Sequence, residues 1–146
     1  MSMSNTAETA LLNLLFANAD WANIGDAGGL LQSVADGSFY VSLHTGDPGE
    51  AGDQTTSECD YTSYARVAVA RTSAAWTVAG NQVSNAAAVT FPTATGGSNT
   101  TTYFAVGRDT SGAGMIIVSA VLTAQLIISS GITPSFAIDA LVATAD

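Results

Sequence analysis

Two patterns of apolar positions divide the chain. In residues 5–24, NTAETALLNLLFANADWANI, apolar side chains recur at helical spacing. The recurring positions are Leu11, Leu14 or Leu15, and Ala19. Asn5 followed by Glu8 fits a variant of the capping box, and three glycines within GDAGG at 25–29 favour a loop afterwards. The pattern therefore predicts one substantial helix over 5–24.

From residue 38 onward the apolar positions follow the two-residue period of β-strands. SFYVSLH at 38–44 and YARVAVAR at 64–71 both alternate. In the second, one face carries Tyr64, Arg66, Ala68 and Ala70 and the other carries Ala65, Val67, Val69 and Arg71. AWTVAGNQVSN places a Gly-Asn corner between two extended pieces, which indicates a hairpin. The remaining predicted strands are AAVTFP, TTYFAVGR, GMIIVSAVL, QLIISSG and PSFAIDALVAT.

The number and spacing of these segments predict the fold class. About eight or nine short strands, separated by turn residues and without alternating helices, favour an antiparallel sandwich or closed barrel over a parallel sheet. We therefore expect a mainly β fold, an antiparallel β-sandwich or jelly roll with one N-terminal α-helix; the pattern itself does not choose the jelly roll over another sandwich. A length of 146 residues fits a single domain over 1–146, with the helix at 5–24 and the sandwich at 38–146.

The charge of the chain limits the classes of molecule that it is expected to bind. Three Arg, no Lys and twelve acidic residues give a formal net charge of −9. Nucleic-acid binding requires clustered cations, so we expect no direct contact with nucleic acid. The acidity also disfavours an anionic membrane surface, and the longest apolar runs are far shorter than the roughly 20 residues of a membrane-spanning helix. The N-terminus has no positive residue before its apolar part, which predicts no secretory signal and synthesis inside the cell.

His44, the one histidine, lies in FYVSLHTGDPGEAGDQ at 39–54. It precedes three acidic residues, Asp47, Glu50 and Asp53. One interpretation is a metal or acid-base site. The other, which we favour, is a histidine at a strand end beside a solvated turn, because Pro48 and Gly49 suit a type II turn. The segment also lacks the regular alternation and the terminal Glu of a calcium loop.

Other chemistry is not indicated by the sequence. A single cysteine, Cys59, excludes an internal disulfide framework and a cysteine-based zinc site. Its neighbours Glu58 and Asp60 are expected to raise the thiol pKa. The glycine pairs at 28–29 and 96–97 match no phosphate loop, and no Gly-x-Ser-x-Gly segment is present. We therefore expect no catalytic residue, no metal ligand and no cofactor.

The arginines and the large apolar residues are expected to be structural. Arg66 and Arg71 fall on opposite faces of one predicted strand, so at most one should point inward, and Arg108 ends another strand. Each is expected to pair with a carboxylate of its own chain or of a neighbour. The core candidates are Trp21, Trp76, Phe91, Tyr103, Phe104 and Phe136. A possible docking face for a partner on the helix comprises Leu11, Leu14, Leu15 and Phe16.

Several segments taken in order resemble a known family. They are SNTAETALLNLLF, YVSLHTGDPGEAG, YARVAVAR, NAAAVTFPTAT, YFAVGRDTSGAGMIIVSAVL and ITPSFAIDALVATAD. This order is similar to that of small structural proteins of tailed phages, which are often labelled tail-fibre proteins and which, on virions, are head decoration or cement proteins with a jelly-roll fold. The stretch at 20–37, DWANIGDAGGLLQSVADG, is longer than the usual link between helix and first strand.

The resemblance implies a function without catalysis. Such proteins sit as trimers at local threefold positions on the outer surface of the capsid and bridge subunits of the major capsid protein. It thus implies a homotrimer made in the cytoplasm of the host bacterium and bound to the shell, which it stabilises by mass action. Two alternatives are a tail or receptor-binding component that recognises a host surface, and an enzyme built around His44.

Overall fold

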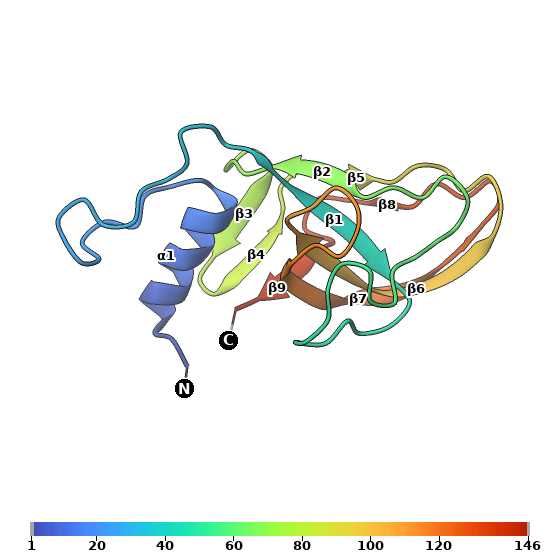
Figure 1. Cartoon of the computed structure of the whole chain (residues 1–146), viewed down its shortest axis with the longest axis horizontal. Helices are drawn as coiled ribbons and strands as arrows, with labels where there is room; N and C mark the ends of the chain where they lie inside the picture. The colour runs from blue at the N-terminus through green and yellow to red at the C-terminus, as the bar shows by residue number, and fades with distance from the viewer. Residues whose placement is uncertain (1, 146) are drawn as a thin grey trace.

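The computed structural model describes residues 2–145. Over these residues the chain is mainly β, with one α-helix at its N-terminal end (Figure 1). The helix is α1 (Asn5–Phe16). The strands are β1 (Ser38–His44), β2 (Val67–Ala70), β3 (Trp76–Ala79), β4 (Gln82–Asn85), β5 (Val89–Thr90), β6 (Ser98–Gly107), β7 (Ile116–Ser129), β8 (Ser135–Phe136) and β9 (Val142–Thr144).

The strands form three antiparallel sheets. A four-stranded sheet has the order β2-β1-β6-β7, a three-stranded sheet the order β3-β4-β9, and β5 pairs with β8. Figure 1 shows the β3–β4 hairpin beside α1 and the long β6–β7 pair reaching to the far end of the molecule. The predicted fold class, antiparallel β with an N-terminal helix, is confirmed, whereas the jelly-roll topology stays a prediction.

The helix is shorter than the predicted range of 5–24. It ends at Phe16, because Asn18 adopts a left-handed conformation with φ 47°, which asparagine tolerates better than most residues. The Asn13 carbonyl accepts from the N–H groups of both Ala17 and Ala19, which closes the helix end. The segment that follows leaves the helix axis and forms the long link to β1.

The start of the helix also differs from the prediction. Ser4, not Asn5, is the N-cap, and its hydroxyl oxygen accepts from the Ala7 N–H at 3.4 Å. Glu8 does not serve as the acid of a capping box, since its side chain is buried on the inner face of α1. Its own N–H donates to the Ser4 carbonyl as part of the first helical turn.

Local signals placed several strands correctly. β1 occupies the predicted 38–44, and β3 pairs with β4 around the predicted Gly-Asn corner, where Gly80 has φ 63°. The strand predicted over 64–71 is shorter in the structure: β2 begins at Val67, and Arg66 lies buried just before it. Within β2 the predicted alternation holds, with Val67 and Val69 half-buried and the two alanines exposed.

Two predicted boundaries near the C-terminus were wrong. GMIIVSAVL and QLIISSG form one strand, β7, because Thr123 and Ala124 between them lie in a bulge: Thr101 lies opposite Leu126, but Tyr103 lies opposite Val121. PSFAIDALVAT, predicted as one strand, forms β8 and β9 in different sheets. The chain turns between them at Asp139, which has φ 59°.

The core joins α1 to the sheets. Its aromatic centre is Phe16, whose ring lies 5.2 Å from that of Phe39 and 5.0 Å from that of Trp76, both edge-on. The predicted core aromatics Trp76, Phe91 and Phe104 are buried, whereas Trp21, Tyr103 and Phe136 are half-buried.

The buried stripe of α1 differs from the predicted one. It comprises Glu8, Leu12 and Phe16, while Leu11, Leu14 and Leu15 are half-buried. Phe16 therefore belongs to the core of its own chain rather than to a docking face. No helix among residues 2–145 combines the length and apolar character needed to cross a membrane.

Candidate functional site

His44 ends β1 and is fully buried, with 0% of its surface exposed. Its Nδ1 lies 2.8 Å from the Thr56 carbonyl oxygen and its Nε2 lies 2.8 Å from Ser42 Oγ. Since a carbonyl only accepts, Nδ1 carries the proton and Nε2 accepts from the Ser42 hydroxyl. Burial lowers the pKa of His44, which keeps the ring neutral at pH 7. Both ring nitrogens are thus occupied by structural hydrogen bonds.

The acidic turn after His44 uses two of its carboxylates on its own backbone. Asp47 Oδ1 accepts from the Gly49 N–H at 2.9 Å, and Asp53 Oδ1 accepts from the Thr55 N–H at 2.8 Å. Hydrogen bonds from the side chain and the backbone of Thr55 hold the pKa of Asp53 below its usual value. Glu50 is exposed. Within residues 2–145 no three His, Cys, Asp or Glu side chains gather closely enough to hold a metal ion.

Cys59 is a buried thiol, not an activated one. Its Sγ lies 3.0 Å from Thr101 Oγ1. Burial, reinforced by the negative charges of Asp60 and Glu58, raises the pKa of Cys59 to about 11. The predicted direction is confirmed, with burial as the larger cause, and the thiol stays protonated at neutral pH.

Arg66 and Glu58 form a buried ion pair. Arg66 Nε and Nη2 donate to the two oxygens of Glu58 at 2.7 and 2.8 Å, and only 3% of the Arg66 side chain is exposed. The Tyr64 hydroxyl donates to the same carboxylate at 2.9 Å. Arg66 also donates to the carbonyls of Asp109 and Gly112, so the network ties the 109–114 loop to the start of β2. The expected carboxylate partner is confirmed here.

Arg71 departs from that expectation. Its guanidinium donates to the carbonyl oxygens of Leu14 and Leu15, at the end of α1, and lies 5.3 Å from the centre of the Phe39 ring. Both Arg66 and Arg71 thus turn toward the body of the protein, which corrects the expectation that at most one would. The reason is that Arg66 precedes β2 and does not follow its alternation. A cation at this place also suits the negative end of the helix dipole.

Arg108 is the exposed arginine of the three. It pairs with its neighbour Asp109 at 3.1 Å, and 65% of its side chain is exposed. The predicted carboxylate partner is confirmed. An exposed pair of this kind contributes little to stability.

Gln54 is a structural residue that the sequence did not indicate. It is fully buried, its Oε1 accepts from the Asp109 N–H at 3.0 Å, and its Nε2 donates to the Tyr40 carbonyl at 3.4 Å. A Cβ at Gly107 would lie 2.1 Å from Gln54 Cδ, and one at Gly114 would lie 2.2 Å from its Oε1. The two glycines therefore make room for this side chain, which depends on contacts between distant segments and has no local sequence signal.

Large apolar side chains are also exposed at the surface. One group lies on the segment 20–37, which we call the arm, and comprises Ile24, Leu30, Leu31 and Val34. Further exposed apolar side chains are Val121 and Ile127 on β7, Met115 and Ile132 in the segments next to it, Ile138 between β8 and β9, and Val142 on β9. β7 itself carries no charged residue over its 14 positions. Exposed apolar side chains on an uncharged strand such as β7 are typical of surfaces that bind other proteins.

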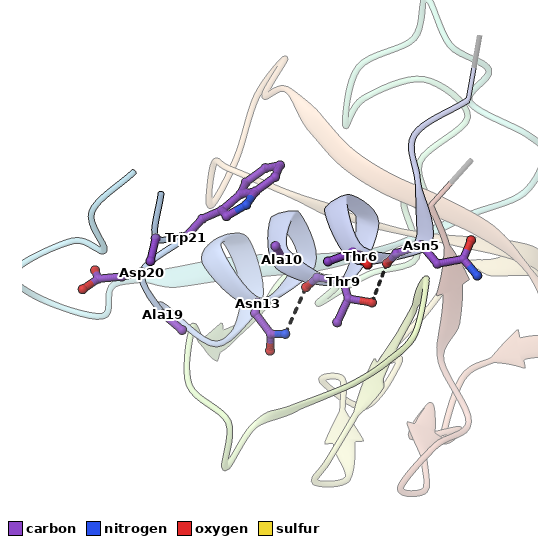
Figure 2. Close-up of a pocket in the computed structure, with 9 residues that line it drawn as sticks. Asn5, Thr6, Thr9, Ala10, Asn13, Ala19, Asp20 and Trp21 are labelled. Carbon is purple, nitrogen blue, oxygen red and sulfur yellow. Dashed lines mark hydrogen bonds between the residues drawn. The ribbon is translucent and has the colours of Figure 1, made fainter. Parts of the chain in front are cut away.

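A shallow groove of about 720 Å³ runs between the outer face of α1 and the base of the arm (Figure 2). Its lining residues are Asn5, Thr6, Thr9, Ala10, Asn13, Ala19, Asp20, Trp21 and Ala22. Figure 2 shows the polar ends of Thr9 and Asn13 turned onto the helix: Thr9 Oγ1 lies 2.8 Å from the Asn5 carbonyl, and Asn13 Nδ2 lies 3.0 Å from the Thr9 carbonyl. These groups are satisfied internally, so the groove offers a largely apolar wall.

Comparison with known proteins gives one family. The model described as podophage GP4 fiber I protein gp80 matches residues 2–144. No curated protein matches the chain. The match agrees with the phage structural family that the sequence resembles, and head decoration stays a prediction. Because the match covers almost every residue, the chain belongs to the family of the podophage GP4 fiber I protein gp80.

Proposed function

We propose that this protein is a structural component of the phage virion that binds the outer surface of the head as a decoration protein and acts through contact rather than catalysis. The observation that carries the proposal is the set of large apolar side chains exposed on an uncharged strand, foremost Val121 and Ile127 of β7. When another protein covers such side chains, apolar surface is removed from water and the free energy of the system falls. The buried histidine and thiol, held by structural hydrogen bonds, agree with a role without reaction chemistry.

The proposed mechanism is mass action on the assembled shell. A protein that binds the assembled shell but not free subunits stabilises the shell by an amount that grows with the logarithm of its free concentration relative to its Kd. As a trimer at a local threefold position, each unit would bridge neighbouring subunits of the major capsid protein. Its contacts then combine through multivalency, so individually weak contacts suffice.

The second candidate is a fibre or tail component. The matching family is that of a fiber I protein, which favours this candidate. In that case the same apolar surface would bind a tail protein or present a host-recognition face. The two candidates differ in where the protein sits on the particle and in how many copies are bound.

Particle binding tests the proposal directly. Purified protein is mixed with heads that lack it, the heads are pelleted, and bound copies and the temperature of DNA release are measured. We expect saturation at a stoichiometry set by the threefold positions and a higher release temperature. A few copies confined to the tail would instead support the fibre candidate, and absence of binding to any part of the particle would contradict both.

A matched pair of variants identifies the surface. Val121→Asp places a charge among the exposed apolar residues of β7, and Thr77→Asp places the same charge on an exposed position of β3. We expect V121D to reduce the number of bound copies while T77D binds as the unmodified protein does. Both variants should melt as the unmodified protein does, because both positions are solvent-exposed.

A further inference from the structure

β7 is a long strand with one open edge. It lies at the end of the sheet order β2-β1-β6-β7, so among residues 2–145 no strand pairs with its other side. In the same part of the chain, no loop backbone forms a hydrogen bond with the backbone of residues 116–128. Alternate N–H and C=O groups of an edge strand point away from its neighbour and can pair with another chain. β7 therefore offers a row of main-chain donors and acceptors.

The composition of β7 does not protect this edge. Proteins usually protect exposed edges with charged residues, with proline or by keeping the strand very short. β7 has 14 residues, IIVSAVLTAQLIIS, none of which is charged or a proline. The opposite edge strand of the same sheet, β2, has four residues and lies between Arg66 and Arg71. The contrast indicates a partner strand for β7.

The bulge between Val121 and Leu126 limits where a partner strand can pair. Before the bulge, β7 keeps a regular register with β6 from Val118 to Val121. Ser119 and Val121 are exposed and Leu122 is buried, so one face of this stretch is open to solvent. An added strand would place alternate side chains beside Val121, a position that suits apolar or β-branched residues.

An acidic hollow of about 600 Å³ lies beside the start of this stretch. The turn after β1 contributes Asp47 and Glu50 to one side of the hollow, and residues 116–119 of β7 form another side. Asp47 and Glu50 are both exposed. Within residues 2–145 neither carboxylate forms an ion pair with an arginine of the chain. The end of the open edge therefore carries negative charge that the chain itself does not neutralise.

Charge indicates which kind of strand fits. A lysine or arginine of the partner would pair with the two carboxylates of the acidic hollow. A second copy is a poor source of this cation, because the sequence has no Lys, Arg66 and Arg71 turn into their own chain, and Arg108 is paired with its neighbour. We propose that the open edge of β7 takes up an extended segment of another virion protein as an added strand, with a lysine or arginine of that segment in the acidic hollow. The inference rests on the proposed function, in which that protein is the major capsid protein, and it names the kind of segment that β7 binds.

Peptides of defined chemistry test the open edge. The probe is a short peptide of alternating Val and Thr with an Arg at each end, and the amide NMR signals of the isotope-labelled protein report where it binds. We expect the signals of residues 118–121 to shift, and we expect no shift with the same peptide carrying Glu at its ends. A third peptide has the side chains and charge of the probe but methylated backbone nitrogens, so it lacks main-chain donors and should not bind.

A matched pair of variants tests the acidic hollow. Glu50→Gln removes one carboxylate from the hollow, and Thr77→Arg makes the same change in net charge at an exposed position of β3. E50Q should bind the probe about two- to fivefold more weakly, because one exposed ion pair is lost. T77R should bind the probe as the unmodified protein does. Both variants should melt as the unmodified protein does, since both positions are exposed.

The outcomes separate this inference from the proposed function. Absence of shifts at β7, binding of the methylated peptide, or equal binding of the probe by E50Q and T77R would overturn the added strand with its cation. If the protein binds heads and excess probe leaves the number of bound copies unchanged, the proposed function holds and this inference is wrong. If the probe binds β7 as expected but the protein binds no head, the strand-accepting edge holds and head decoration fails.

Discussion

His44 and Cys59 are titratable side chains whose protons are fixed by burial. The His44 ring is held by Ser42 on one nitrogen and by the Thr56 carbonyl on the other. Its type and position near three acidic residues are compatible with a metal site, and only the three-dimensional contacts show how the ring is used. The residue joins the end of β1 to the loop that precedes Cys59, so its function is to hold two segments together.

This arrangement predicts a pH dependence of stability. Burial lowers the pKa of folded His44 below its ordinary value of 6.5, so below about pH 6.5 the unfolded chain takes up a proton that the folded chain does not. The free energy of unfolding should therefore fall as the pH decreases from 6.5 toward the folded pKa, by at most about 1.4 kcal/mol per pH unit. Urea unfolding at several pH values on both sides of this range measures the slope.

His44→Gln is the matched control for that slope. Glutamine keeps hydrogen-bonding capacity but does not titrate, so the variant should be less stable at neutral pH and should lose this part of the pH dependence. The carboxyl of Asp53, whose pKa is also lowered, affects stability only below its usual value of 3.8 and does not interfere. An equal slope in H44Q and in the unmodified protein would rule out His44 as its source.

At the scale of elements, Arg71 fastens α1 to the sheets. Arg71→Ala removes charged hydrogen bonds to the carbonyls of Leu14 and Leu15 and the contact with the Phe39 ring. We expect a loss of about 2–3 kcal/mol in the free energy of unfolding, because hydrogen bonds to charged groups contribute about 1.5–3 kcal/mol. Arg108→Ala removes an exposed pair and should change stability by less than about 0.5 kcal/mol. Chemical denaturation of both variants checks the difference, and equal losses would contradict the fastening role.

Local signals account for the elements that the sequence predicted correctly. The Gly-Asn corner and the alternation of SFYVSLH are properties of a few adjacent residues, and both led to the observed strands. The end of α1 depends on one left-handed asparagine, Asn18, within a pattern that is helical on both sides. The continuity of β7 depends on its pairing with β6, which tolerates a bulge between Val121 and Leu126. Neither feature follows from periodicity.

The polar clusters were the least predictable part of the molecule. Gln54 is buried because Gly107 and Gly114, far along the chain, leave space for it. Arg71 was expected to find a carboxylate and instead binds helix carbonyls, which any sequence offers and no motif marks. The exposure of the arm residues follows from contacts such as that between Asn18 and Ser33, which are likewise invisible in the sequence pattern.

At the scale of the whole molecule, the scarcity of cations makes association sensitive to salt. With three Arg against twelve acidic residues, two copies of the protein repel one another at low ionic strength. Raising the salt from about 0.05 M to about 0.5 M shortens the screening length severalfold and should therefore strengthen the trimer. Sedimentation equilibrium at the two ionic strengths measures the change. Weaker association of the unmodified chain at high salt would mean that ion pairs hold the copies together, and Arg108, the exposed arginine, would then be the residue to examine at the interface.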